Sequence, residues 1–212
     1  KGISAFLEAH RSEAEEEAIR RVSGLAEKSG ARVHICHVSS EMGLKRVIEA
    51  KQAGINMTCE VTPHHLLLTT ADLKKLGNIA LEIPPLRTDT DVNSLWLALH
   101  RAQIDTIGSD HAPHSLEEKQ SQSVWDVKPG IAGLETMLPL LLTQVNRGRL
   151  SLKGLVRLAC KRPAEIYNLR GRGSLNRGFL ADITIVDMDK EFSIDASRFH
   201  SKAKFSPFDG WK

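Results

Sequence analysis

The chain has 212 residues, of which 41% are hydrophobic and 26% are charged. A chain of this length and composition can bury a real core, which excludes a disordered, collagenous or fibrous protein. The net charge of +3 is small and aromatic residues make up only 5%, so neither a basic patch nor a base-stacking surface for nucleic acid is indicated. We expect one large domain, alone or with a small appendage.

The sequence also favours a cytoplasmic protein. Its longest apolar run, around 137–142, is interrupted by Pro139 and is far shorter than the ~18 residues of a membrane span. The three cysteines, Cys36, Cys59 and Cys160, are an odd number without CxxC spacing, which favours a reducing compartment. We therefore expect no membrane contact. The absence of an initial Met suggests a piece of a longer chain.

Strands and helices are predicted to alternate along the chain. Ser12 begins a capping box, apolar residues follow at helical spacing, and Gly30 ends the helix predicted over 12–29. Short runs rich in β-branched residues predict buried strands over 32–38, 56–62 and 104–108. Further helices are predicted over 41–53, 71–76, 91–101, 134–147, 152–160 and 163–168.

Two segments differ from this alternation. Residues 115–131 form a connection that is too long for a plain loop in a compact domain, so we expect it to be functional. After a glycine-rich stretch, residues 181–187 alternate between apolar and polar side chains and predict one more strand.

The order of strands and helices predicts a parallel α/β fold. In barrels of this class, the functional residues lie at the carboxyl ends of the strands. A doubly wound sheet would also fit the order, but neither GxGxxG nor GxxxxGK[ST] follows any predicted strand. The sequence therefore indicates neither a dinucleotide site nor a P-loop.

Histidine and aspartate side chains follow the three predicted strands. They are His37 after the first strand, His64 and His65 after the second, and Asp110, His111 and His114 after the third. Imidazole and carboxylate are ligands that zinc prefers, and a carboxylate beside a metal can also move protons. A barrel would bring these loops to one face.

Each group also has a purely structural explanation. A single histidine such as His37 commonly serves structure, and of His64 and His65 one can pack inside while the other hydrogen-bonds to the backbone. The run Ser-Asp-His-Ala-Pro-His over 109–114 places an acid and two imidazoles close together, which favours a functional site. The cysteines are expected to pack in the core, and Glu117-Glu118-Lys119 to lie in a solvated loop.

Several motifs in the same order resemble those of dihydroorotases of the amidohydrolase superfamily. They are ICHVS at 35–39, CEVTPHHL at 59–66, GSDHAPH at 108–114, EEK at 117–119, PGIAGLET at 129–136, GFLADI at 178–183 and FSPFDGW at 205–211. The resemblance extends over essentially all 212 residues. It implies the C-terminal part of a metal-dependent (β/α)8 TIM barrel over 1–170, and part of a small composite β domain with the C-terminal tail over 171–212.

The resemblance also implies roles for individual residues. His37 and Asp110 match metal ligands, and Asp110 also matches the residue that serves as general base and acid. His114, Pro129 and Gly130 match residues that contact the substrate. The complete enzyme would hold two zinc ions per active site. The His-His pair at 64–65 matches a family motif but not the usual metal ligands.

Some expected features of the family are missing from this chain. A His-x-His motif, a bridging carboxylated Lys or Asp and a further His, all metal ligands in relatives, do not occur before His37. Ile83 precedes Pro84-Pro85 where relatives often have an Asn that contacts the substrate. We therefore expect the chain to supply only the last βα units of a barrel and to be inactive on its own.

The implied activity is the interconversion of N-carbamoyl-L-aspartate and dihydroorotate in pyrimidine biosynthesis. A hydantoinase or allantoinase is an alternative, although those relatives usually lack a histidine at the position of His114. A non-catalytic dihydroorotase-like protein is an alternative of another class. The expected partners are a small-molecule substrate and, in an assembly, a second copy of the chain or other pyrimidine-pathway enzymes.

Overall fold

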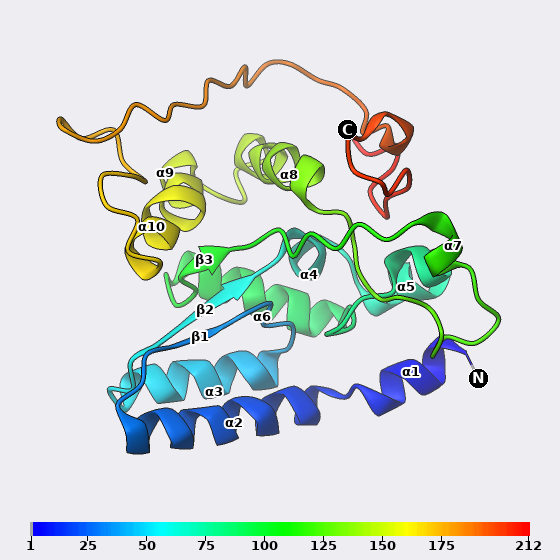
Figure 1. Cartoon of the computed structure of the whole chain (residues 1–212), viewed down its shortest axis with the longest axis horizontal. Helices are drawn as coiled ribbons and strands as arrows, with labels where there is room; N and C mark the ends of the chain where they lie inside the picture. Colours follow the sequence, from blue (N-terminus) through cyan, green and yellow to red (C-terminus); the bar gives the residue numbers. More distant parts are fainter. Residues whose placement is uncertain (1) are drawn as a thin grey trace.

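A small parallel sheet forms the centre of the computed structural model, which describes residues 2–212. Its strands β1 (Val33–Ile35), β2 (Met57–Val61) and β3 (Thr106–Ile107) pair in the order β1-β2-β3 (Figure 1). Ile35 lies opposite Cys59, and Val61 lies opposite Ile107. The predicted parallel α/β arrangement is confirmed, although each strand is shorter than the apolar run that predicted it.

Helices surround this sheet. They are α1 (Ile3–Ala9), α2 (Ser12–Ser29), α3 (Glu41–Gln52), α4 (Pro63–Leu67), α5 (Thr70–Leu76), α6 (Asp89–His100), α7 (Leu116–Lys119), α8 (Leu134–Asn146), α9 (Leu152–Val156) and α10 (Arg162–Ile166). A π-helical segment, η2 (Arg157–Lys161), joins α9 to α10, and 3-10 turns occur at η1 (Gly77–Ala80) and η3 (Ala196–Arg198). In Figure 1, α2 and α3 lie on one side of the strands, and α8, α9 and α10 lie on the other.

Side-chain caps set where several of these helices begin. Ser40 accepts a hydrogen bond from the N–H of Gly43 at the start of α3, and Thr69 and Thr88 form capping boxes at α5 and α6. The expectation that Pro63 simply ends the second strand was incomplete. Thr62 caps a short helix there, and proline is well suited to its first position because the missing N–H would have had no partner.

Two groups of buried side chains hold these layers together. The first lies between the sheet and helices α3, α6 and α9, and it includes Val47, Cys59, Leu95 and Ile104. The second joins both ends of the chain, because Phe6 of α1 and Phe208 near the C-terminus belong to the same cluster. Burial of large apolar side chains such as these contributes about 1.5–3 kcal/mol each. The C-terminal segment is therefore packed onto the rest of the fold.

The strand predicted over 181–187 is not present among the described residues. This part of the chain runs as an extended connection along the outside of the molecule, coloured orange in Figure 1. Ile185 in its middle is 92% exposed. A strand needs a neighbour that accepts and donates its backbone hydrogen bonds, and no described strand lies alongside this segment. The proposed small β domain over 171–212 therefore has no sheet of its own here.

Helices long and apolar enough to cross a membrane do not occur between residues 2 and 212.

A partly buried ionic contact provides a first testable prediction for the fold. Asp105 accepts hydrogen bonds from Lys51 Nζ at 2.5 Å, from the N–H of Cys59 at 2.9 Å and from Arg162 at 2.9 Å. It therefore connects α3, β2 and α10. We expect Asp105→Asn to lower the free energy of unfolding by about 1–3 kcal/mol in urea titrations at pH 7, whereas Asp126→Asn at an exposed position should change it little.

The loss of stability caused by Asp105→Asn should depend on pH in a defined direction. Burial raises the pKa of Asp105, but the hydrogen bonds from Lys51 and from the N–H of Cys59 outweigh it, so the net pKa is lowered. The stabilisation is then complete above the unfolded-state pKa of about 3.9 and is lost as the pH falls through the folded-state value. Equal destabilisation by the two substitutions at pH 7 would contradict the assigned role.

Candidate active site

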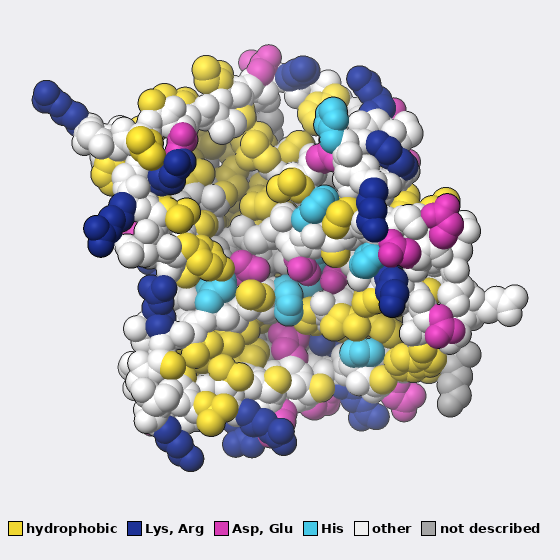
Figure 2. All heavy atoms as spheres, in the orientation of Figure 1, with side chains coloured by type: hydrophobic (Ala, Val, Ile, Leu, Met, Phe, Trp, Pro, Cys, Tyr) yellow, Lys and Arg dark blue, Asp and Glu magenta, His cyan; other side chains and the backbone are white. Residues whose placement is uncertain are grey.

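The three strands are parallel, so the segments that follow them all begin at the same end of the sheet. His37 follows β1, Thr62 follows β2 and Asp110 follows β3. Both His37 (φ 40°) and Asp110 (φ 44°) adopt left-handed backbone conformations, which are uncommon for residues other than glycine and occur often at functional sites. Figure 2 shows histidine and acidic side chains gathered in a band across the middle of this face.

The loop after His37 is fixed to α2 by a buried ionic network. Glu15 accepts a hydrogen bond from the N–H of Ser39 at 2.9 Å and pairs with Arg87 at 3.3 Å. Arg87 also donates to Ser39 Oγ at 2.9 Å and to the carbonyl of His10 at 2.6 Å. The backbone that carries His37 is therefore held by charged groups on two other segments.

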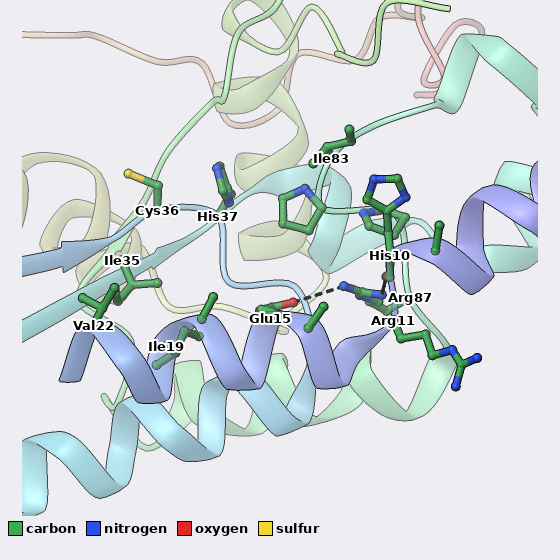
Figure 3. Close-up of a pocket in the computed structure, with 15 residues that line it drawn as sticks. His10, Arg11, Glu15, Ile19, Val22, Ile35, Cys36, His37, Ile83 and Arg87 are labelled. Atoms are coloured by element: carbon green, nitrogen blue, oxygen red, sulfur yellow. Dashed lines mark hydrogen bonds and ion pairs between the residues drawn. The ribbon is translucent and has the colours of Figure 1, made fainter. Parts of the chain in front are cut away.

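A cavity of about 320 Å³ lies beside His37, between α2 and the segment around Ile83 (Figure 3). Its walls are mostly apolar and include Ile19 and Ile35, while Glu15 and Arg87 lie at its floor joined by their ion pair. Ile83 is 45% exposed. The apolar side chain of Ile83 thus faces the cavity near His37, one of the predicted site residues.

Asp110 lies within a cluster of buried polar side chains. Ligand-type atoms of His64, Glu82 and Asp110 all lie within 4.8 Å of one another. Burial, followed by repulsion from Asp110, raises the pKa of Glu82 to about 8. Burial lowers the pKa of His64 well below its ordinary value, with further contributions from His65 and His37. His64 therefore lies near both of the predicted metal ligands, His37 and Asp110.

The two adjacent histidines after β2 differ in their surroundings. Both nitrogens of His65 have partners, with Thr62 Oγ1 at 2.9 Å and the carbonyl oxygen of Pro84 at 2.9 Å. Burial lowers the pKa of His65 to about 3. His64 is equally buried, but its Nε2 has no hydrogen-bond partner among the described residues. The structural explanation of the pair, with one ring packed inside and one bonded to the backbone, is confirmed for His65.

The long connection after Asp110 returns to the site. His111 pairs with Ile131 in a parallel bridge, and Nδ1 of His111 accepts a hydrogen bond from the N–H of Leu134 at 3.1 Å. His111 therefore anchors this loop through its backbone and its ring. The pairing brings Pro129 and Gly130 beside the run that contains His114.

His114 and Gly130 are in direct contact. A Cβ atom at Gly130 would lie 2.9 Å from Cδ2 and 3.1 Å from Nε2 of the His114 ring, and 2.6 Å from the Cβ of Ala112. The N–H of Gly130 donates to the carbonyl of Leu81 at 2.8 Å. On its other side, His114 Nδ1 lies 3.5 Å from Glu118. Two of the residues to which the family resemblance assigns substrate binding are therefore neighbours.

The expectation of a solvated loop at 117–119 is wrong for Lys119. That side chain is 1% exposed, and its Nζ donates to the carbonyl of Leu81 at 3.0 Å. Burial lowers the pKa of Lys119 to about 8, and the nearby Glu82 carboxyl partly opposes this effect. The short helix α7 turns Lys119 inward, so the loop is tied to the segment that carries Glu82.

The prediction that all three cysteines pack inside holds only for Cys59. Cys59 is buried, whereas Cys36 and Cys160 are exposed. Cys36 follows Ile35, the last paired residue of β1, so it has already left the sheet. Cys160 lies on η2, where the outer side of the helix faces solvent.

Glu82 was not identified from the sequence. It stands within the apolar run Ile-Ala-Leu-Glu-Ile at 79–83, where a single acid has no partner nearby in sequence. An acid inside an otherwise buried run is the signal that could have found it, because a charge is seldom buried without a partner.

The comparisons identify the family of this chain. A sequence model described as the amidohydrolase family matches residues 2–210. The chain belongs to the amidohydrolase family. It is 38% identical over 99% of its length to the L-hydantoinase of Paenarthrobacter aurescens, and 46% identical over 88% to the dihydroorotase of Anoxybacillus flavithermus. It spans 47% and 44% of these two relatives, which is less than half of each.

Solved amidohydrolase structures resemble this one closely. An L-hydantoinase (dihydropyrimidinase) from Arthrobacter aurescens has a TM-score of 0.89 at 40% identity, over 92% of this chain and 44% of that one. A D-hydantoinase (dihydropyrimidinase) from Thermus sp. has a TM-score of 0.90 at 27% identity, over 94% and 45%. The amidohydrolase fold expected from the motifs is confirmed.

The contact at Gly130 gives a second testable prediction for this amidohydrolase. Gly130→Ala should lower the free energy of unfolding by about 2–4 kcal/mol, because the new methyl group collides with Ala112 and His114 and the backbone has a positive φ of 146°. Gly148→Ala is the matched control, since Gly148 also has a positive φ but no atom within 4 Å of an added Cβ. Its cost should be about 1 kcal/mol. Chemical denaturation would measure both, and equal losses would refute the close contact.

Proposed function

We propose that this chain is the C-terminal part of a zinc-dependent dihydroorotase, which interconverts N-carbamoyl-L-aspartate and dihydroorotate in pyrimidine biosynthesis. The observation that carries the proposal is the contact between His114 and Gly130, close to the buried cluster around Asp110. The 46% identity to the dihydroorotase of Anoxybacillus flavithermus supports the same reaction. Hydantoinases usually lack a histidine at position 114, which is why this residue favours the dihydroorotase reaction.

The residues present fit the zinc that the family implies. The imidazole of His37 and the carboxylate of Asp110 leave the sheet at the same edge, and both are donor types that zinc accepts. Under this proposal they are the chain's share of the metal ligands, and the other ligands come from the rest of the enzyme. When bound, zinc would polarise the scissile carbonyl and lower the pKa of a water molecule.

Asp110 is assigned the proton transfers. Hydrolysis of a cyclic amide requires that the attacking water lose a proton and that the departing amide nitrogen gain one. A carboxylate can accept the first proton and donate it in the second step, and both steps reverse when the ring closes. Asp110 is partly exposed, so substrate and water can reach it, while Glu82 beside it is buried.

His114 and the backbone at Pro129–Gly130 are assigned to substrate binding. Dihydroorotate and N-carbamoyl-aspartate both carry a carboxylate, and an imidazole N–H is a suitable donor to such a group. His114 is partly exposed, and one of its ring nitrogens lies near Glu118, which would orient the ring. Gly130 has no side chain, which allows the His114 ring to lie directly against its backbone.

Loss of Asp110 should nearly abolish the reaction. In the complete enzyme, Asp110→Ala is expected to reduce kcat by about 10²- to 10⁴-fold in both directions, because a general acid and base is removed. Dihydroorotate hydrolysis and ring closure would be followed by absorbance, with circular dichroism as a check on folding. Wild-type rates in this variant would exclude the proposed proton transfer.

Substitution of His114 should change KM, whereas substitution of Asp110 should change kcat. His114→Ala in the complete enzyme is expected to raise KM for dihydroorotate by about tenfold or more, because a charge-assisted hydrogen bond of ~1.5–3 kcal/mol is lost. The zinc content should not change, since His114 is assigned to the substrate and not to the metal. Zinc analysis of the purified variant decides between these roles, and loss of zinc would show that His114 is a ligand.

A hydantoinase is the second candidate, and one observation favours it. Ile83 presents an apolar, half-exposed side chain to the cavity beside His37, where dihydroorotases often have a polar Asn. An apolar wall is better suited to the hydrocarbon substituent of a 5-substituted hydantoin than to a carboxylate. The match to the L-hydantoinase of Paenarthrobacter aurescens over 99% of the chain agrees with this.

Kinetics of the complete enzyme with both substrate classes would separate the two candidates. We expect kcat/KM for dihydroorotate to exceed that for L-5-benzylhydantoin by at least 100-fold. The reverse ratio would assign the chain to a hydantoinase. Turnover of neither substrate by zinc-loaded enzyme would favour a non-catalytic relative.

A further inference from the structure

The C-terminal segment reaches the loop that carries His114. In Figure 1 the red C-terminal end lies on the same side of the molecule as α7. Phe208 of this segment shares a buried cluster with Val124 and Val127, which belong to the connection after α7. Lys202, in the middle of the segment, donates a hydrogen bond to Glu118 of α7 at 3.1 Å. A lysine from the far end of the chain therefore lies close to a residue assigned to substrate binding.

The backbone on both sides of Lys202 is held in place. The N–H groups of His200 and Ser201 donate to the carboxylate of Glu135 at 2.9 Å and 3.0 Å. The next residue, Ala203, is buried, and its N–H donates to Ser201 Oγ at 3.2 Å. The contact between Lys202 and α7 thus starts from a fixed point of the chain, although the lysine side chain itself is exposed.

One carboxylate oxygen of Glu118 contacts three groups. Its Oε2 accepts hydrogen bonds from the N–H of Ser115 at 2.7 Å and from Lys202, and it lies 3.5 Å from His114 Nδ1. The contact with Ser115 is half of a capping box, which explains a glutamate at this position of α7. The cap does not require a lysine from the C-terminal segment, so Lys202 needs its own explanation.

The ion pair differs from the exposed pairs on the outer helices. Glu17 and Arg20 in α2, and Arg162 and Glu165 in α10, are three residues apart on the same helix. Lys202 and Glu118 are 84 residues apart in sequence. An exposed ion pair contributes little to stability, so a gain in folding energy does not account for this contact between distant segments.

The negative charge of Glu118 is a disadvantage for binding an anion at His114. The hydrogen bonds from the N–H of Ser115 and from Lys202 lower the pKa of Glu118 to about 2, so its carboxylate is ionised at neutral pH. This charge lies beside the ring that is assigned to the carboxylate of the substrate. A second anion close by would be repelled, unless a cation balances the charge of Glu118. The ammonium group of Lys202 is in the position to do so.

We propose that Lys202 is a specificity-determining residue that neutralises Glu118 and thereby admits anionic substrates to the site at His114. This inference rests on the proposed dihydroorotase function, which assigns a substrate carboxylate to His114. Repulsion by Glu118 grows with the charge of the ligand. N-carbamoyl-L-aspartate carries two carboxylates and dihydroorotate carries one, whereas dihydrouracil has the same ring without a carboxylate. Lys202 should therefore matter most for the first ligand and not at all for the third.

Kinetics of variants of the complete enzyme test this order. Lys202→Met should raise KM for N-carbamoyl-L-aspartate by about fivefold or more and KM for dihydroorotate by about two- to threefold. The inhibition constant of dihydrouracil should not change. Lys202→Arg keeps the charge and should stay close to the unsubstituted enzyme. Lys153→Met is the matched control, because it removes the same charge from an exposed position on α9 and should change none of these constants.

A second variant and the ionic strength separate charge from structure. Glu118→Gln added to Lys202→Met removes the unbalanced charge, and glutamine can still form the capping box, so most of the rise in KM should be reversed. High salt should have a similar effect. At about 1 M salt the Debye length is about 3 Å, and the difference between Lys202→Met and the unsubstituted enzyme should fall below about twofold.

Three results would overturn the proposal. They are an equal loss of affinity for all three ligands in Lys202→Met, an unchanged KM for N-carbamoyl-L-aspartate in that variant, and a difference that high salt does not reduce. The proposed function fails separately, if the unsubstituted enzyme does not turn over dihydroorotate. Both anions would then be measured as inhibitors of hydantoin hydrolysis, and the same order of effects would decide the role of Lys202.

Discussion

The parallel pairing of β2 with both of its neighbours is the constraint on which the candidate site depends. Each strand leads outward at the same edge, so the residues that follow β1, β2 and β3 are brought together although they are far apart in sequence. The pairing itself is short, and α3, α6 and α9 stabilise it by burying the apolar side chains of the sheet. Asp105 adds an ionic link between β2 and the helices on either side.

The site combines loops whose backbone is held by hydrogen bonds with side chains whose charges are not balanced by neighbouring groups of opposite charge. Glu15, Arg87 and Ser39 fix the loop that carries His37, and the return of residues 129–131 fixes the loop that carries His114. Between these loops, the carboxyl groups of Glu82 and Asp110 lie close to the buried ring of His64, whose Nε2 has no hydrogen-bond partner among residues 2–212. Leaving a buried polar atom unpaired costs about 1–3 kcal/mol, so the arrangement lowers stability unless another species is bound. Such a cost is typical of functional sites, where residues are arranged for binding and not for stability alone.

The second group of buried side chains explains why the C-terminal segment remains attached despite the exposed connection before it. Phe208 packs with Phe6 and Leu73, and Ile194 exchanges backbone hydrogen bonds with the end of the chain. Residues 181–187 lack such contacts, and their apolar side chains are open to solvent. Their alternating pattern is that of a strand that buries one face, so the segment has the composition of a sheet element without a sheet beside it.

The sequence by itself determined the alternation of strands and helices, the parallel fold class and the motifs that place the chain among amidohydrolases. Local signals carry this information, because capping residues, β-branched runs and the spacing of apolar side chains act within a few residues. Only the tertiary structure decided which polar groups meet. Glu82 lies in an apolar run and Lys119 in a charged one. Neither context shows that Glu82 turns inward beside Asp110 or that Lys119 turns inward to the carbonyl of Leu81. The strand expected at 181–187 failed for the same physical reason, since a strand is stabilised by a neighbour that its own sequence does not contain.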